Sequence, residues 1–384
     1  MTLNDQLPTK FMRYLSLDFF RGLTIALMIV VNTPGSSLHV FPPLRHAAWH
    51  GCTPTDLVFP FFLFIVGVAL WFSLSASNGT LTPVISGKLL RRAGLIFLVG
   101  LALNAYPFYD KVWGSLRIMG ILQRIGLAFG LAGFLCVLLS KRTLMVAAGL
   151  ILVGYWLALW YFGGDDPFSK ETNLVRQVDL TLLGESHLYK KFGVPFDPEG
   201  LLSTIPAAVN VIFGYLTGSW IADANNREDN EITKKQALCL RLLQNGAIIG
   251  VAGLIFNEIF PINKPLWTSS YVLYTCGLAM IFLSACIWAF DIKGWRKPAQ
   301  PFLVFGANPL IAFVLSGVIV KTMNIFKNTD ANGDVHTPFQ WIYQHIFARI
   351  NDGPWGSLLF SLTYTALIWC VCWVLYKRKI FIRL

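Results

Sequence analysis

The chain has 384 residues, of which 55% are hydrophobic and only 13% are charged. Soluble globular domains carry about 25% charged residues, so the composition excludes an ordinary soluble domain. The net charge of +11 would suit a nucleic-acid partner. The Lys and Arg residues, however, stand in short clusters between apolar runs, which is typical of membrane topology. The composition therefore predicts the lipid bilayer as a partner and excludes nucleic acid.

Apolar runs long enough to cross a bilayer follow one another along the whole chain. We predict an all-α fold, a polytopic membrane bundle of about ten transmembrane helices that forms one domain over residues 1–384. The expected spans are about 19–34, 56–76, 90–107, 117–139, 143–162, 202–222, 237–257, 268–290, 299–322 and 356–376.

The distribution of basic residues predicts the orientation. An even number of spans places both termini on one side, and most of the 31 Lys and Arg residues lie on that side. The positive-inside rule makes it the cytoplasmic side. Two long segments, about 163–201 and 323–355, then lie outside. The first carries acids and aromatic residues that could bind a polar ligand, or it is a plain connector; the second is a turn-rich connector.

The first two spans enclose a short polar loop. Asp18 and Arg21 are three residues apart and are expected to pair on one helical face. His46 lies in the loop and is a residue type that exchanges protons near neutral pH. Asn32 ends the first span, and Asp56 either orients His46 or caps the second span. Polar groups at the ends of membrane spans are costly, so we expect the chemistry here.

Other readings of this loop are weaker. His46 and His50 are four residues apart, but no third ligand is clustered with them in the sequence, so no metal site is predicted. A nucleophilic pair of Cys52 with His46 is a second alternative. The chain contains no P-loop, dinucleotide-binding glycine motif or zinc-protease motif.

Two further polar residues fall inside predicted spans. Arg124 lies near the middle of the fourth span, seven residues after Arg117, and we expect the two on one helical face. A buried arginine either joins a structural ion pair or holds an anionic ligand. Asn308 precedes a proline in the ninth span, where a helix break could line a cavity.

Several blocks of the sequence resemble one enzyme family. The opening LDFFRG is similar to that of membrane acyltransferases, and the block RHAAWHGCTPTDLVFPFFLFIVG resembles the heparan-α-glucosaminide N-acetyltransferase family. The further blocks VDLTLLGESHLY, FDPEGLLSTI, PINKPLWTSSYV and LYKRKIFIRL agree. The similarity extends over essentially the whole chain.

The resemblance implies transfer of acetyl from cytoplasmic acetyl-CoA to the amine of glucosamine, or of a terminal glucosamine residue, on the outer side. It implies His46 as the central residue, either as general base or as transient acetyl acceptor, with Asn32 beside it as an oxyanion donor. It also implies an amino-sugar acceptor, a bacterial inner (plasma) membrane and a homodimer.

This chemistry predicts two binding regions. The coenzyme A phosphates should lie in a deep cytoplasmic vestibule, with the pantetheine arm passing toward His46. The expected cofactor-binding residues are Arg21, Lys88, Arg91, Arg92, Arg124 and Asn308. Trp49 and Trp267 either stack on the sugar or belong to an interfacial aromatic belt. The other expected sugar-binding residues are Asp179, Glu185, His187, Asp197 and Glu199.

Two alternatives stay open. A transporter for amino sugars or other small solutes would also use intramembrane polar residues and a broken helix, but it would not need acetyl-CoA. An O-acetyltransferase of an envelope glycan would keep the enzyme class and change the acceptor from an amine to a hydroxyl.

Overall fold

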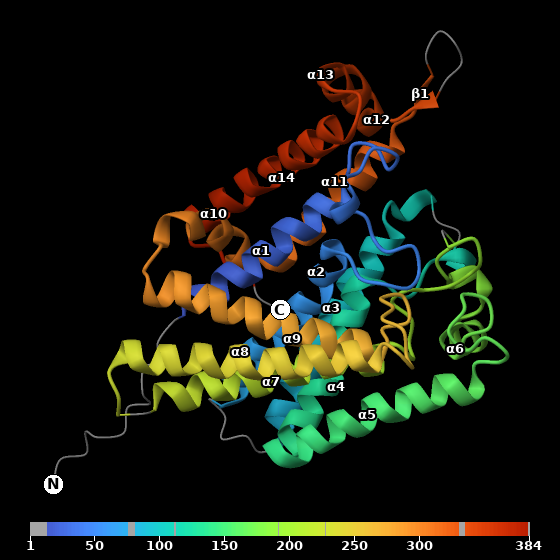
Figure 1. Cartoon of the computed structure of the whole chain (residues 1–384). Coiled ribbons are helices and arrows are strands. Elements are labelled where there is room, and N and C mark those ends of the chain that lie inside the picture. The colour runs from blue at the N-terminus through green and yellow to red at the C-terminus, as the bar shows by residue number, and fades with distance from the viewer. Residues whose placement is uncertain are drawn as a thin grey trace.

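The computed structural model describes residues 14–75, 81–110, 113–190, 192–226, 228–329 and 335–382. These residues form a bundle of long helices (Figure 1). The strands in this part of the chain are β1 (Asn328–Thr329) and β2 (Val335–His336), which pair antiparallel. The predicted all-α class is confirmed.

The long helices match the apolar runs of the sequence closely. They are α1 (Leu15–Asn32), α2 (Pro54–Ser75), α3 (Pro83–Ala105), α4 (Ile121–Leu138), α5 (Lys141–Phe162), α7 (Thr204–Asn225), α8 (Glu231–Phe256), α9 (Ser269–Cys286), α10 (Arg296–Ala307), α11 (Pro309–Ile325) and α14 (Pro354–Lys377). The two long connecting segments contain α6 (Leu174–Leu183), α12 (Pro338–Ile342) and α13 (Ala348–Ile350).

The count of spans differs from the prediction. Among the described residues, eight helices are long and apolar enough to cross a membrane, and α10 with α11 makes a ninth if that bent pair is one span. The remaining predicted span is α3, whose first half contains Lys88, Arg91 and Arg92. These three cations fall within its apolar stretch, which sets this helix apart from the eight. The side on which the termini lie stays a prediction.

The break expected at Asn308 is present, because α10 and α11 meet there at an angle of 74°. The fourth span, in contrast, begins later than predicted. Helix α4 starts at Ile121, so Arg117 precedes it and does not share a helical face with Arg124. Gly120, with an extended backbone, separates Arg117 from the helix.

Helix α7 lies at the centre of the bundle and packs against α2, α4 and α5. Its contact with α2 is close enough to require glycine on both sides. A Cβ atom at Gly214 would lie 1.9 Å from the carbonyl oxygen of Phe64, and one at Gly67 would lie 2.0 Å from that of Val211. Helices α1, α10, α11 and α14 form a second packed group, which α1 joins to α2 (Figure 1).

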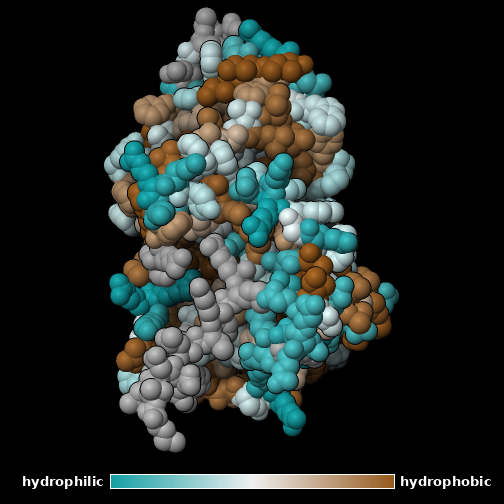
Figure 2. All heavy atoms as spheres, turned by 90° about the vertical axis from the view of Figure 1, so that its left-hand side faces the viewer, coloured by the Kyte–Doolittle hydropathy of each residue, from teal (hydrophilic) through white to brown (hydrophobic). Residues whose placement is uncertain are grey.

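The outer helices expose apolar side chains, as lipid-facing helices do. Helices α5 and α8 are each buried over only 28% of their most apolar window, against 83% for α7. Charged side chains gather instead at the end of the molecule where α8 and α10 begin. Figure 2 faces this end and shows many hydrophilic side chains there, with hydrophobic ones among and above them; Glu231, Arg296 and Lys297 are exposed.

Candidate active site

Two cavities follow one another along α1. The larger has a volume of about 1110 Å³ and is lined by Asp18 and Arg21 from the first half of the helix and by Ile25 from its middle. The smaller, which we call the His46 cavity, has a volume of about 270 Å³ and is lined by Val31 and Asn32 from its last turn, together with His46. A helix rises 1.5 Å per residue, so Arg21 and Asn32 are about 16 Å apart along the axis.

The side chain of Met28 lines both cavities. Helices α2 and α4 also contribute side chains to both cavities. Helix α2 contributes Phe59 to the His46 cavity and Phe62 to the large cavity, and α4 contributes Ile121 and Leu122 in the same way. A thin layer of apolar side chains centred on Met28 therefore separates the two spaces.

His46 and Asp56 form a hydrogen-bonded pair at the wall of the His46 cavity. His46 Nδ1 lies 2.6 Å from Asp56 Oδ1, and the carboxyl group is 1% exposed while the imidazole is half exposed. A proton on Nδ1 that is donated to the carboxylate leaves Nε2 with a free lone pair. This is the tautomer that a base or nucleophile needs.

The second carboxylate oxygen of Asp56 shapes the loop that carries His46. Asp56 Oδ2 accepts hydrogen bonds from the backbone N–H of Ala47 at 3.0 Å and of Thr53 at 3.1 Å, and from the Thr53 hydroxyl at 3.0 Å. Thr53 immediately precedes α2, so its N–H bond to Asp56 is a capping contact at the start of the helix. The geometry is therefore compatible with both roles predicted for Asp56, orientation of His46 and capping of the second span.

Lys264, which the sequence analysis did not select, completes this cluster. Its Nζ lies 3.1 Å from His46 Nδ1 and 3.3 Å from Asp56 Oδ1. Burial lowers the pKa of Lys264, although the charge of Asp56 opposes this shift. The loop is held beside His46 by a bridge between Gly51 and Asn263, in which Gly51 N–H donates to the carbonyl of Ile262 at 2.7 Å. The block PINKPLWTSSYV contained the lysine, but nothing in that string marked its partner.

Asn32 lines the His46 cavity from the last residue of α1 and is exposed. Its side chain makes no hydrogen bond to any other described residue, so its amide group is free to meet a ligand. All three residues predicted to be catalytic, His46, Asn32 and Asp56, thus line the same cavity.

A buried ion-pair group forms another wall of this cavity. Arg117 donates to Asp197 through Nε at 2.8 Å and through Nη2 at 2.7 Å, and Nη2 also contacts Glu199 at 2.5 Å. Asp197 is fully buried, whereas Arg117 and Glu199 line the cavity. Although burial opposes it, the two carboxylates raise the pKa of Arg117. The ion pairs attach the segment 163–201 to the start of α4.

The two tryptophans have different surroundings. Trp267 is 1% exposed, lines the His46 cavity and donates its Nε1–H to Asn210 at 2.9 Å, so it is not part of a lipid-facing belt. Trp49 lies outside the lining of both cavities. It donates to the carbonyl of Phe168 at 2.8 Å and packs against Phe196.

The remaining residues predicted for the sugar lie away from the cavity. Asp179 is fully buried and accepts the N–H of Leu201 at 2.9 Å. Glu185 is exposed, and His187 Nδ1 contacts the carbonyl of Leu116 at 2.7 Å. The structure therefore brings only Glu199 and Trp267 from the predicted sugar set to the His46 cavity.

Two residues predicted for the donor molecule, Arg124 and Asn308, line neither cavity. Arg124 is fully buried, donates to the Gly200 carbonyl and to the Ser203 hydroxyl, and stacks at 4.7 Å over the Trp267 ring. It supports the turn that leads into α7. Asn308 is also fully buried and bonds to the end of the chain.

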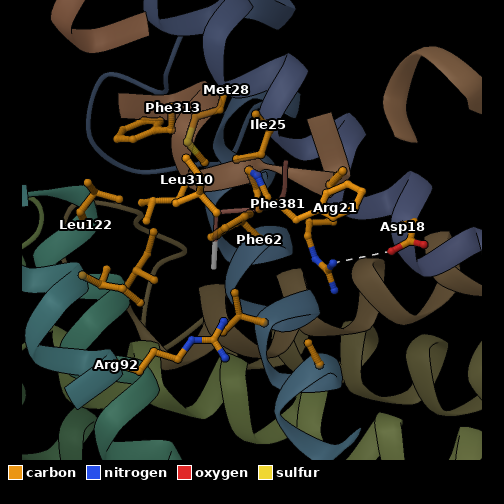
Figure 3. A pocket seen from close by; sticks show the side chains of 18 of the residues that line it. Asp18, Arg21, Ile25, Met28, Phe62, Arg92, Leu122, Leu310, Phe313 and Phe381 are labelled. Carbon is orange, nitrogen blue, oxygen red and sulfur yellow. Dashed lines mark ion pairs between the residues drawn. The ribbon is translucent and has the colours of Figure 1, made fainter. Parts of the chain in front are cut away.

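The large cavity contains two of the four other predicted cations. Arg21 and Arg92 line it, and Figure 3 shows their guanidinium groups pointing into the same space. Arg92 stacks at 4.9 Å over Phe129, and Arg21 pairs with Asp18 at 3.7 Å. Lys88 and Arg91, one turn or less from Arg92, are exposed and do not line the cavity. Lys377 and Lys379 line it and were not predicted.

The two weaker readings of the loop gain no support from the geometry. Burial raises the pKa of Cys52 to about 12, and the charge of Asp56 adds to the shift, so the thiol stays protonated and is a poor nucleophile. His50 lies 3.4 Å from the amide of Asn263 and does not line the cavity. The described part of the chain contains no group of three His, Cys, Asp or Glu residues placed to hold a metal ion.

Comparison with known proteins identifies the family of the chain. The family model described as heparan-alpha-glucosaminide N-acetyltransferase, catalytic, matches residues 13–256, which include His46, Asp56 and Arg92. The chain belongs to this family. Members of the family in human and mouse are named heparan-alpha-glucosaminide N-acetyltransferase.

The similarity to these relatives extends beyond the family model. The alignment with the human protein is 421 positions long, covers 96% of this chain and shows 28% identity. The alignment with the mouse protein is 422 positions long, covers 95% of this chain and shows 27% identity. The chain spans 59% of the length of each relative.

Proposed function

We propose that this membrane protein is an N-acetyltransferase that takes acetyl from acetyl-CoA and delivers it to the amine of glucosamine or of a terminal glucosamine residue. The observation that carries the proposal is the pair of cavities that meet at Met28. One has cationic side chains suited to the phosphates of coenzyme A. The other has a His–Asp pair suited to proton transfer. Family membership supports the same reaction class.

The donor fits the large cavity. Its volume of about 1110 Å³ accommodates a drug-sized or larger ligand, and it combines Arg21 and Arg92 with an apolar lining. The acetyl thioester would pass the layer at Met28 to reach His46. The positive-inside distribution of Lys and Arg supports a cytoplasmic opening of this cavity, and hence an acceptor on the opposite side.

The acceptor fits the His46 cavity. A sugar there would meet the carboxylate of Glu199 and the ring of Trp267, and its amine would lie near His46. Carboxylates accept hydrogen bonds from sugar hydroxyls, and aromatic faces pack on apolar sugar faces. The ion pairs of Arg117 with Asp197 and Glu199 hold this wall in place.

In the direct route, the amine attacks the thioester carbonyl carbon and its proton passes to His46 Nε2. Asn32 donates its amide N–H to the oxyanion of the tetrahedral intermediate. Collapse breaks the C–S bond, and the proton on His46 neutralises the departing thiolate. In the alternative route, His46 Nε2 attacks the thioester carbonyl carbon and the C–S bond breaks, so that coenzyme A leaves as the thiolate. The amine then attacks the acetyl carbon and displaces the imidazole, and the proton that the amine loses neutralises the thiolate. Asp56 holds the same tautomer in both routes.

The test uses protein purified in detergent, with labelled acetyl-CoA and glucosamine. We expect labelled N-acetylglucosamine from the wild type and from His50→Ala, a matched control in the same loop, and none from His46→Ala. Label on the protein without acceptor would indicate the acetyl-histidine route. If the folded wild type binds glucosamine but never consumes acetyl-CoA, the transporter replaces the enzyme. Transfer to a hydroxyl but not to an amine would indicate the O-acetyltransferase.

The bacterial inner membrane and the homodimer remain predictions.

A further inference from the structure

The end of the chain completes the wall of the large cavity. Helix α14 ends at Lys377, and the chain then turns at Lys379, which has a φ of 55°. Lys377 and Lys379 line the cavity together with Phe381 and Ile382. Figure 3 shows Phe381 among the side chains of the cavity wall, beside Arg21. We call residues 377–382, from the last residue of α14 onward, the tail.

Asn308 holds the tail in place. Its Nδ2 donates to the carbonyl of Ile380 at 3.0 Å, and its Oδ1 accepts the N–H of Ile382 at 2.9 Å. One amide side chain thus satisfies two backbone groups, as a neighbouring strand would. Asn308 is fully buried, so its side chain is fixed and its loss would release the tail from the α10–α11 break. The sequence analysis predicted that Asn308 binds the donor molecule. In the structure its side chain binds the backbone of the tail.

The tail changes the charge of the cavity. The basic residues that line it are Arg21, Arg92, Lys377 and Lys379, and Asp18 is the acidic one. Two of the four cations therefore come from the end of the chain. Arg92 lies deep against Phe129, and its Nε is buried without a hydrogen-bond partner among the described residues. The apolar lining between the cations, such as Met28 and Phe313, suits an uncharged arm.

Resting on the proposed function, we propose that Lys377 and Lys379 bind the phosphates of the coenzyme A nucleotide and that Asn308 positions them. Lysine ammonium groups bind phosphate as point charges, and charge-assisted hydrogen bonds are about twice as strong as neutral ones. The tail then makes the cavity selective for a nucleotide-bearing thioester over the same thioester without the nucleotide. Lys377 and Lys379 are specificity-determining residues, and Asn308 acts through them.

The test measures binding of coenzyme A and of pantetheine, which lacks the nucleotide, to the purified full-length protein by calorimetry. We expect Lys377→Gln and Lys379→Gln each to weaken binding of coenzyme A by about tenfold and to leave pantetheine binding unchanged. Lys297→Gln, an exposed lysine outside the cavity lining, is the matched control and should bind both as the wild type does.

The positioning role of Asn308 has a separate readout. Asn308→Ala keeps both lysines but frees the tail, so the KM for acetyl-CoA should rise by about tenfold while kcat is retained. The KM for acetyl-pantetheine should not change, whereas a general loss of folding would impair the reaction with both donors.

Equal affinity of the wild type and both lysine variants for coenzyme A would overturn the inference, and so would an equal loss of pantetheine binding. In either case the proposed function stands if the wild type still transfers acetyl. If the wild type binds no coenzyme A and transfers no acetyl, both the proposed function and this inference are wrong.

Discussion

The side chains of His46 and Lys264 are 218 residues apart in sequence, yet Lys264 Nζ lies 3.1 Å from His46 Nδ1. Asp56 Oδ1 contacts both groups, at 2.6 Å from the imidazole Nδ1 and 3.3 Å from the Lys264 Nζ. The ammonium compensates a carboxylate that is 1% exposed. A buried carboxylate with two basic partners can hold the imidazole without carrying an uncompensated charge.

We expect Asp56→Asn to reduce kcat by at least about 100-fold. The amide can present its N–H to His46 Nδ1, which would move the ring proton to Nε2 and remove the free lone pair. The assay is acetyl transfer to glucosamine, with Asp352→Asn as a control at an exposed acid outside the cavity linings. Full activity of folded Asp56→Asn would show that the pair has no catalytic role.

Met28 is predicted to control passage of the acetyl group. A tryptophan at this position would fill the layer between the cavities, so Met28→Trp should abolish acetyl transfer while coenzyme A and glucosamine still bind. Met28→Leu conserves volume and should keep most of the activity. Binding is measured by calorimetry and transfer by labelled product. Undiminished transfer by Met28→Trp would mean that acetyl takes another path.

The stability of the segment 163–201 should depend on pH through Asp179. Burial raises the pKa of this carboxyl group to about 7, partly offset by the hydrogen bond from Leu201, and Asp197 adds to the rise. Because the pKa of Asp179 is higher in the folded state, its contribution to stability is fully present below the unfolded-state pKa near 4. That contribution is lost as the pH rises through the folded-state pKa of about 7. The full effect is about 4 kcal/mol as an upper limit.

Asp179→Asn keeps the acceptor for Leu201 N–H and removes the titration. The melting temperature of the wild type in detergent should therefore fall relative to that of Asp179→Asn between pH 5 and pH 8. Glu185→Gln, an exposed acid in the same segment, should follow the wild type. Parallel curves for wild type and Asp179→Asn would show that Asp179 is ionised over the whole range.

The contact between α2 and α7 predicts a large effect of a single methyl group. A Cβ at Gly214 would lie 1.9 Å from the Phe64 carbonyl, so Gly214→Ala must separate the two helices and should destabilise the protein by about 1–3 kcal/mol or more. Gly149→Ala is the matched control, because its Cβ meets nothing within 4 Å and alanine favours the helix. Thermal melting in detergent compares them. Equal melting temperatures would show that the two helices accommodate the methyl group.

Much of the fold was predictable from the sequence. An apolar run of about 20 residues in a bilayer has to satisfy its backbone within the segment, so the run itself predicts a helix. The break at Asn308 followed from the next residue, a proline, for the same local reason. Span boundaries were less certain: Arg117 belongs outside α4, because a loop ion pair with Asp197 holds it there. Helix α3 was predicted as a span although its cations set it apart.

The candidate site, like the fold, was predictable from the sequence only in part. His46, Asn32 and Asp56 were found together because they lie within 25 residues of one another, at the borders of two consecutive spans, and so reach one cavity through local chain geometry. Lys264, Arg117, Lys377 and Lys379 were not found, because a loop lysine or arginine carries no local sign of its partner. Only packing decides which of 31 basic residues face a cavity. The sequence by itself determined the helices and the His46 loop through short-range patterns. The tertiary structure decided the cationic partners, since those contacts join residues far apart in the chain, 80 residues for Arg117 with Asp197 and 218 for Lys264 with His46.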